Sequence, residues 1–144
     1  IEAFNKLGWP LKIIGDGPEG KQLRKIAKAN IEFVGLVPEK KLRDYYGRCR
    51  ALIFPQEEDF GIVAVEAMAA GRPVIAYEAG GALEIVKEGE TGIFFKEQTV
   101  DSLVTVLKSF KAEKFSPQLI REQSLRFDKE VFKKKIKEFV DQSL

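Results

Sequence analysis

The 144-residue sequence predicts an α/β domain of the doubly wound, Rossmann-like kind, in which helices cover both faces of a parallel β-sheet. Short apolar runs alternate with amphipathic helical patterns along nearly the whole chain. The runs are almost continuously apolar, which is typical of strands that are buried on both faces. The length fits one domain with one core.

The strands are expected where a short apolar run ends in glycine, proline or a turn. Pro55, for example, cannot donate a ladder hydrogen bond and stops the third run. The expected strands are 11–15, 31–34, 51–54, 73–77 and 92–95.

Helices are expected between these strands. Pro18 suits a first helical turn, and Gly71 suits the position just after a helix end. The expected helices are 1–7, 18–29, 38–48, 61–70, a short one from Gly80-Gly81 to Val86, 100–110, and two further C-terminal stretches.

Composition excludes several functions. The net charge is +2, and no basic stripe is interleaved with aromatic residues, so nucleic-acid binding is not expected. Cys49 is the only cysteine and there is no histidine, which excludes an internal disulfide, a His/Cys metal site and histidine acid–base chemistry within this chain. A reducing compartment, the cytoplasm, is expected. The cluster 133–137 predicts a solvated basic helix face, with peripheral contact to an anionic membrane surface as the alternative.

Ligands of doubly wound folds bind at the carboxyl ends of the strands, where this chain is rich in glycine. Residues 15–20 match the dinucleotide-binding pattern G-x-G-x-x-G, but the second strand ends in Val34-Gly35-Leu36 without the acid that would hold a ribose. NAD is therefore not expected. Gly20-Lys21-Gln22 also departs from the Walker pattern, which needs Ser or Thr after the lysine.

The loop 55–61 carries three consecutive acids, Glu57, Glu58 and Asp59, before a helix. One acid would be enough to complement a helix dipole. The helix that follows is apolar except at Glu66, so we expect it to be buried and Glu66 to need a partner. A carboxylate there could hold the two hydroxyls of a ribose, or it could be a structural tie to neighbouring backbone. Amides around Gly61 would form an anion site, and Gly80-Gly81 would form either a second one or a tight turn.

These motifs resemble glycosyltransferase family 4. The resemblance rests on Glu58-(seven residues)-Glu66 within 57–77, on Gly80-Gly81 and on residues 89–92, and it extends upstream through 15–18 and 33–35. The form of 57–62 is most similar to the mannosyltransferases of O-antigen and polysaccharide assembly.

The resemblance implies one half of a two-domain GT-B fold. Residues 1–144 would be the C-terminal, donor-nucleotide-binding domain, truncated at its start, as the first residue Ile1 also suggests. The N-terminal acceptor domain would be absent, and with it the diphosphate-binding Arg and Lys that precede the first helix. The implied activity is a retaining, metal-independent transfer of a hexosyl group from GDP-mannose or a UDP-sugar to a glycan or lipid-linked acceptor, in the cytoplasm or at the cytoplasmic face of a membrane. The chain alone would be inactive, and no cofactor is expected.

The resemblance also implies roles for individual residues. Glu58 would be the catalytic-site carboxylate that binds donor-sugar hydroxyls, and Glu66 would hold the ribose. The remaining residues would act through backbone or close packing. Phe60, Gly61, Ile62 and Val63 would bind sugar and phosphate, Leu36 and Val37 would border the base, and Gly15 and Gly17 would let it lie against the backbone.

The chain departs from the family pattern at two positions, with Asp59 where many members have Gly and Ala64 where many have Pro. Two alternatives remain open at this point. One is a nucleotide-sugar-binding or regulatory module without transferase activity. The other is a nucleotide-sugar epimerase of the same fold, although such epimerases carry essential histidines. An α-glucan phosphorylase would need a cofactor lysine just after Glu66, and none is present.

Overall fold

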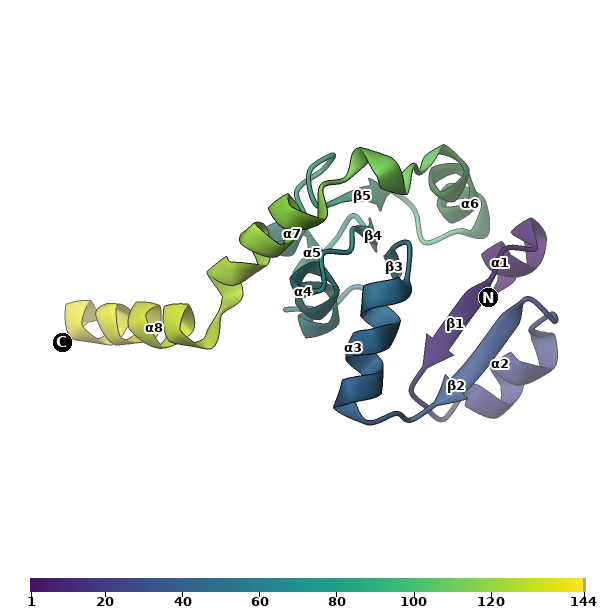
Figure 1. Ribbon diagram of the computed structural model, residues 1–144, viewed down its shortest axis with the longest axis horizontal. Coiled ribbons are helices and arrows are strands. Elements are labelled where there is room, and N and C mark those ends of the chain that lie inside the picture. Colours follow the sequence, from purple (N-terminus) through teal and green to yellow (C-terminus); the bar gives the residue numbers. More distant parts are fainter. Residues whose placement is uncertain (144) are drawn as a thin grey trace.

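The computed structural model describes residues 1–143 and has the expected α/β Rossmann-like fold (Figure 1). The strands are β1 Leu11–Ile14, β2 Ile31–Gly35, β3 Leu52–Phe54, β4 Val74–Tyr77 and β5 Gly92–Phe95. The helices are α1 Glu2–Leu7, α2 Gly20–Ile26, α3 Glu39–Arg48, α4 Ile62–Ala69, α5 Ala82–Ile85, α6 Val100–Ser109, α7 Pro117–Ser124 and α8 Lys129–Ser143, with 3₁₀ turns η1 Ala112–Lys114 and η2 Leu125–Phe127.

Each predicted strand is present, but the helix predicted over 18–29 is too long. Pro18 lies in the turn before α2, and the helix ends at Ile26. The reason is tertiary: the side chain of Asn5 donates to the carbonyl of Ile26 and accepts from the amide of Lys28. These two bonds replace the helical bonds that would have continued α2.

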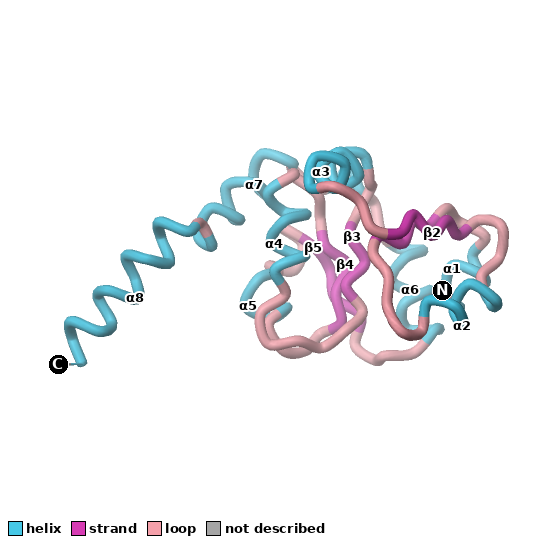
Figure 2. The backbone as a smooth tube through the Cα atoms, turned by 90° about the horizontal axis from the view of Figure 1, so that it is seen from below, coloured by secondary structure: helices cyan, strands magenta, loops and turns pink. Residues whose placement is uncertain are grey.

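Among the described residues the strands form two parallel sheets. β1 pairs with β2, while β3, β4 and β5 form a second sheet in that order. Figure 1 shows β1 and β2 side by side, and Figure 2 shows β2 apart from the group of β3, β4 and β5. Strand pairing requires a spacing of about 4.8 Å. Within residues 1–143 no such ladder joins β1 to β3, and residues of both strands line one cavity.

The second sheet is covered on both faces, as the apolar runs predicted. Val74 and Ala76 of β4 point into a cluster with Phe54, Met68 and Ile85. Ile75, between them, points into the opposite cluster. This cluster includes Phe4 of α1, Leu107 of α6 and Ile31 of β2. The alternation of neighbours along one strand is the geometric consequence of the two-residue period.

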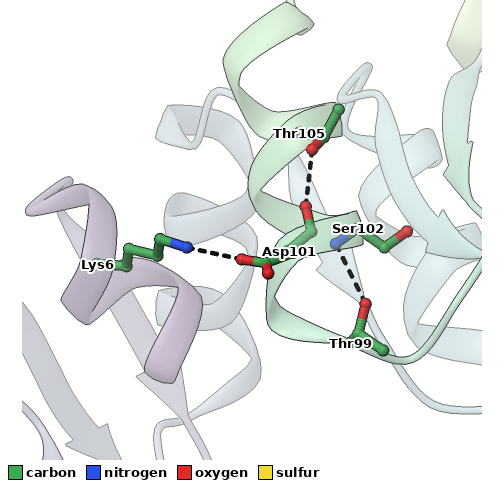
Figure 3. Close-up of polar contacts among 5 residues, drawn as sticks. All are labelled: Lys6, Thr99, Asp101, Ser102 and Thr105. Atoms are coloured by element: carbon green, nitrogen blue, oxygen red, sulfur yellow. Dashed lines mark hydrogen bonds and ion pairs between the residues drawn. The ribbon is translucent and has the colours of Figure 1, made fainter.

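Helix α6 closes the side of the second cluster and packs on α1 (Figure 3). The hydroxyl of Thr99 caps it by accepting from the amide of Ser102 at 3.2 Å. Lys6 of α1 pairs with Asp101 at 2.6 Å, which lowers the pKa of Asp101 through that hydrogen bond. Both partners are exposed, so the pair orients the two helices more than it stabilises them.

The C-terminal helix α8 extends away from the body of the domain (Figures 1 and 2). Its lysines at 133–135 and 137 are exposed, as predicted for a solvated face, and so are the apolar side chains of Phe132, Ile136 and Val140. Across residues 1–143, no helix combines the length and the apolar character that crossing a bilayer demands.

Candidate functional site

A cavity of about 950 Å³ lies between the two sheets and opens at the carboxyl ends of β1, β2 and β3. Most of its lining is apolar and includes Ile13 of β1 and Ile53 of β3. Five of the predicted site residues line it, namely Gly15, Leu36, Val37, Val63 and Glu66. The loops that follow β1, β2 and β3 therefore converge on one end of this cavity.

Two glycines shape the rim where β1 and β2 end. Gly15 has φ +108° and Gly35 has φ +77°, and the amide of Gly15 donates to the carbonyl of Gly35 at 2.9 Å. A residue with a side chain would be strained at both positions. Gly17, the other glycine predicted to border the base, does not line the cavity, and its amide donates to the side chain of Asp16.

Helix α4 begins at Gly61, as predicted, and presents an N-terminus without a side-chain cap. Gly61 has φ +81°, and a Cβ atom there would lie 2.9 Å from the ring of Phe54. Glycine is thus required by both backbone and packing. The first amides of such a helix have no partner within the helix and favour an anion.

The side chains on either side of Gly61 point away from the cavity. Phe60 and Ile62 are 54% and 61% exposed. The ring of Phe60 packs edge-on against Phe127 and lines a second cavity of about 680 Å³ with Glu84 and Arg126. Any contact of Phe60 or Ile62 with a ligand in the first cavity would be through the backbone, which is the role predicted for them.

The acidic loop is exposed and is held by its backbone. Glu58 accepts from the side chain of Gln56 at 2.9 Å, and its carbonyl accepts from the amide of Gly81 at 2.8 Å. A Cβ on Gly80 would lie 2.7 Å from the carbonyl oxygen of Glu58, and one on Gly81 would lie 2.5 Å from that of Asp59. Gly80-Gly81 is therefore a tight turn that supports this loop, and the four-residue α5 after it offers no second anion site.

The prediction that α4 is buried all round is wrong. One side, with Ala64, Ala67 and Met68, is buried, but Val63 and Glu66 are exposed. The reason is that α4 packs on the sheet and on α7 while its other side faces the cavity. Glu66 therefore does not need a partner to compensate for burial, and its carboxylate is accessible from the cavity.

Glu66 nevertheless has a partner that the sequence did not reveal. The hydroxyl of Tyr46, on α3, donates to Glu66 Oε2 at 3.0 Å. One interpretation of the sequence was that Glu66 is tied to neighbouring backbone. Its partner is instead a side chain 20 positions away. Nothing in the helical pattern around Tyr46 indicated this, because the aromatic side chain reads as an ordinary core residue.

Gln56 is the other site residue that sequence reasoning missed. It lines the cavity and positions Glu58 through the hydrogen bond described above. Its place directly after the strand-ending Pro55 was the available signal. Among the residues described, no three acidic or sulfur side chains come together in a way that could hold a metal ion.

Comparison with known proteins adds to this geometry. The family model described as "Glycosyl transferases group 1" matches residues 1–135. The sulfoquinovosyl transferase of Arabidopsis thaliana is 32% identical over 127 residues, which are 82% of this chain and 25% of that protein. The exopolysaccharide phosphotransferase of Streptomyces coelicolor is 33% identical over 120 residues, which are 74% of this chain and 12% of that protein.

Solved structures agree on the fold. The crystal structure of the Anabaena protein HepE with UDP and glucose superposes with a TM-score of 0.78 at 22% identity, covering 97% of this chain and 43% of that one. The chain spans between 12% and 31% of the length of the first three curated relatives that it matches.

Proposed function

The chain belongs to the group 1 glycosyl transferases, and on that premise we propose that it binds the nucleotide-sugar donor for hexosyl transfer to a glycan or lipid-linked acceptor. The observation that carries the proposal is the convergence of Gly15, Leu36, Val37, Val63 and Glu66 on one cavity at the strand ends. In this proposal residues 1–144 are the C-terminal, donor-binding domain of a two-domain GT-B enzyme.

Each part of the cavity suits one part of a nucleoside diphosphate sugar. The apolar turn of Leu36 and Val37 and the bare backbone at Gly15 suit the flat face of a base. The carboxylate of Glu66, accessible from the cavity, can accept two hydrogen bonds from a ribose. The uncapped start of α4 at Gly61 suits the diphosphate. Glu58, held by Gln56, would bind the sugar hydroxyls.

The donor is the finer part of the proposal. GDP-mannose is the donor that the sequence resemblance implies. The HepE structure superposed above was solved with UDP and glucose, which makes a UDP-sugar the main competitor. The apolar rim at Leu36 and Val37 carries no side-chain donor or acceptor that would select one base, so titration must decide.

Glu66→Ala is expected to weaken binding of both the nucleoside diphosphate and its sugar ester by about ten- to a hundredfold, because a hydrogen bond to a charged group is lost. NMR titration with GDP, GDP-mannose, UDP and UDP-glucose measures this and also selects the base. Glu58→Ala is the matched comparison. It should weaken binding of GDP-mannose or UDP-glucose but leave the affinity for the free nucleoside diphosphate nearly unchanged.

Two results would contradict these assignments. Unchanged affinities in Glu66→Ala would remove Glu66 from the ribose site. An equal loss for diphosphate and sugar ester in Glu58→Ala would remove Glu58 from the sugar site.

The proposal also includes retention of configuration and independence from divalent metal ions. The helix start at Gly61 would contribute to stabilising the departing diphosphate electrostatically. Transfer by the two-domain enzyme is therefore expected to continue in excess EDTA, and proton NMR of the product is expected to show an α-linkage from an α-linked donor. A strict requirement for Mg²⁺ or Mn²⁺, or a β-linked product, would contradict this part.

A further inference from the structure

A buried tyrosine stands behind the proposed ribose ligand. Tyr46 is 9% exposed, whereas Glu66, whose Oε2 accepts its hydroxyl at 3.0 Å, is exposed. Both residues line the 950 Å³ cavity. Within residues 1–143, Tyr46 is the only side chain that donates to this carboxylate, so one of its oxygens is fixed and the other is left for a ligand.

The tyrosine hydroxyl acts as a donor at neutral pH. Burial, together with the hydrogen bond to Glu66, raises the pKa of Tyr46 well above its usual value. The proton therefore stays on the phenol, and the direction of the hydrogen bond is defined.

The end of α3 that carries Tyr46 is itself held in place. The carbonyl of Tyr46 accepts from the thiol of Cys49 at 3.3 Å, and the carbonyl of Tyr45 accepts from the amide of Cys49 at 3.0 Å. Arg72, which follows α4, donates to the carbonyl of Gly47. Three consecutive carbonyls at the C-terminus of α3 thus accept hydrogen bonds. One of the donors is the cationic Arg72, and the helix dipole favours a positive charge at this end.

Such an arrangement restrains a side chain that would otherwise be mobile. An exposed glutamate samples several rotamers. Only some of them place the carboxylate where it can accept hydrogen bonds from two vicinal hydroxyls. A hydroxyl on a buried ring, fixed by the end of its helix, selects one of these rotamers before any ligand arrives. Pre-organisation of this kind improves affinity by reducing the ordering cost on binding.

We propose that Tyr46 is a positioning residue for the donor site, holding the Glu66 carboxylate so that its free oxygen faces the ribose hydroxyls. This inference rests on the proposed function and deepens it. The ligand class is a ribonucleoside diphosphate, and the property that Tyr46 controls is the preference for ribose over 2′-deoxyribose.

The test is the ratio of affinities for a ribonucleoside diphosphate and its 2′-deoxy analogue, UDP with 2′-deoxy-UDP and GDP with 2′-deoxy-GDP. Tyr46→Phe keeps the ring and removes only the hydroxyl. It is expected to weaken binding of the ribonucleotide by about three- to tenfold. Binding of the deoxy analogue, which keeps only one of the two hydroxyls, should weaken by less, so that the ratio falls. NMR titration of the 144-residue chain is suited to weak binding of this kind.

The matched control is Tyr45→Phe. Tyr45 is on the same helix and half-buried, its ring lies beneath Lys12, and its hydroxyl makes no hydrogen bond to Glu66 among the described contacts. This change should alter neither affinity. In the double variant Tyr46→Phe, Glu66→Ala, loss of the tyrosine hydroxyl should have no further effect on the ratio, because there is no carboxylate left to orient.

The other outcomes separate the two hypotheses. If Glu66→Ala lowers the ratio but Tyr46→Phe does not, Glu66 is a ribose ligand and the positioning role is overturned. If Tyr46→Phe weakens both nucleotides equally, the hydroxyl has only a structural role and the inference is again overturned. If Glu66→Ala itself changes neither affinity, the proposed ribose site fails, and the role of Tyr46 fails with it.

Discussion

Residues 1–144 on their own are expected to transfer no sugar, with turnover more than about a thousandfold below that of the two-domain enzyme of our proposal. Holding two reactants in near-attack geometry can supply roughly 7–11 kcal/mol of barrier lowering. In our proposal the acceptor is held by the other domain, so this chain alone would not supply that geometry. Loss of that geometry accounts for a decrease of this size.

The same chain should still bind nucleotide, so the prediction includes a positive result beside the absence of turnover. The proposed ribose ligand, Glu66, and the helix start at Gly61 are both within this chain. We expect a dissociation constant near the millimolar range, which corresponds to a binding free energy of about −4 kcal/mol.

A nucleotide-release assay of the chain beside the two-domain protein, with NMR titration of the chain as the folding and binding control, measures both quantities. Comparable turnover by the chain alone would place the chemistry within these residues and overturn the division between the two domains.

Gly81→Ala is expected to disturb the acidic loop more than any substitution of an exposed acid within it. The new Cβ would lie 2.5 Å from the carbonyl oxygen of Asp59 and 2.8 Å from that of Phe60, so backbone atoms must move. The amide of Gly81 is also the donor that fixes the carbonyl of Glu58. Overpacking of this kind costs about 1–3 kcal/mol and should lower the Tm by roughly 3–10 °C.

Function should be affected with stability, because the displaced segment leads directly into Gly61 and the start of α4. Donor-sugar affinity is expected to fall at least tenfold at a temperature where the variant remains folded. Gly47→Ala is the control, since no atom lies within 4 Å of its added Cβ and alanine is favoured in a helix. Calorimetry and NMR titration measure the two effects. A Gly81→Ala variant with unchanged Tm and affinity would show that the loop does not depend on this turn.

The sequence was sufficient to predict the strands and the fold class. The apolar run 73–77, for example, was predicted as a strand buried on both faces, and the side chains of β4 alternate between two clusters as expected. Gly61 was predicted as a helix start and takes the left-handed conformation that requires glycine. These features are local, because the spacing of apolar residues and the conformational freedom of glycine depend only on residues close together in the sequence.

The end of α2 and the exposure of Glu66 were not predictable in this way. Helix α2 ends at Ile26 because Asn5, far away in the sequence, satisfies the backbone there. The exposure of Glu66 depends on which side of α4 meets α7 and the sheet.

The contact between Tyr46 and Glu66 was decided by tertiary structure alone. Each residue has an ordinary place in its own helix, Tyr46 on the buried side of α3 and Glu66 on the exposed side of α4. Only the packing of α3 beside α4 brings a phenol within 3.0 Å of a carboxylate 20 residues later. Local pattern encodes which side of an element is apolar, but the partner of a polar group depends on how elements far apart in the sequence pack together.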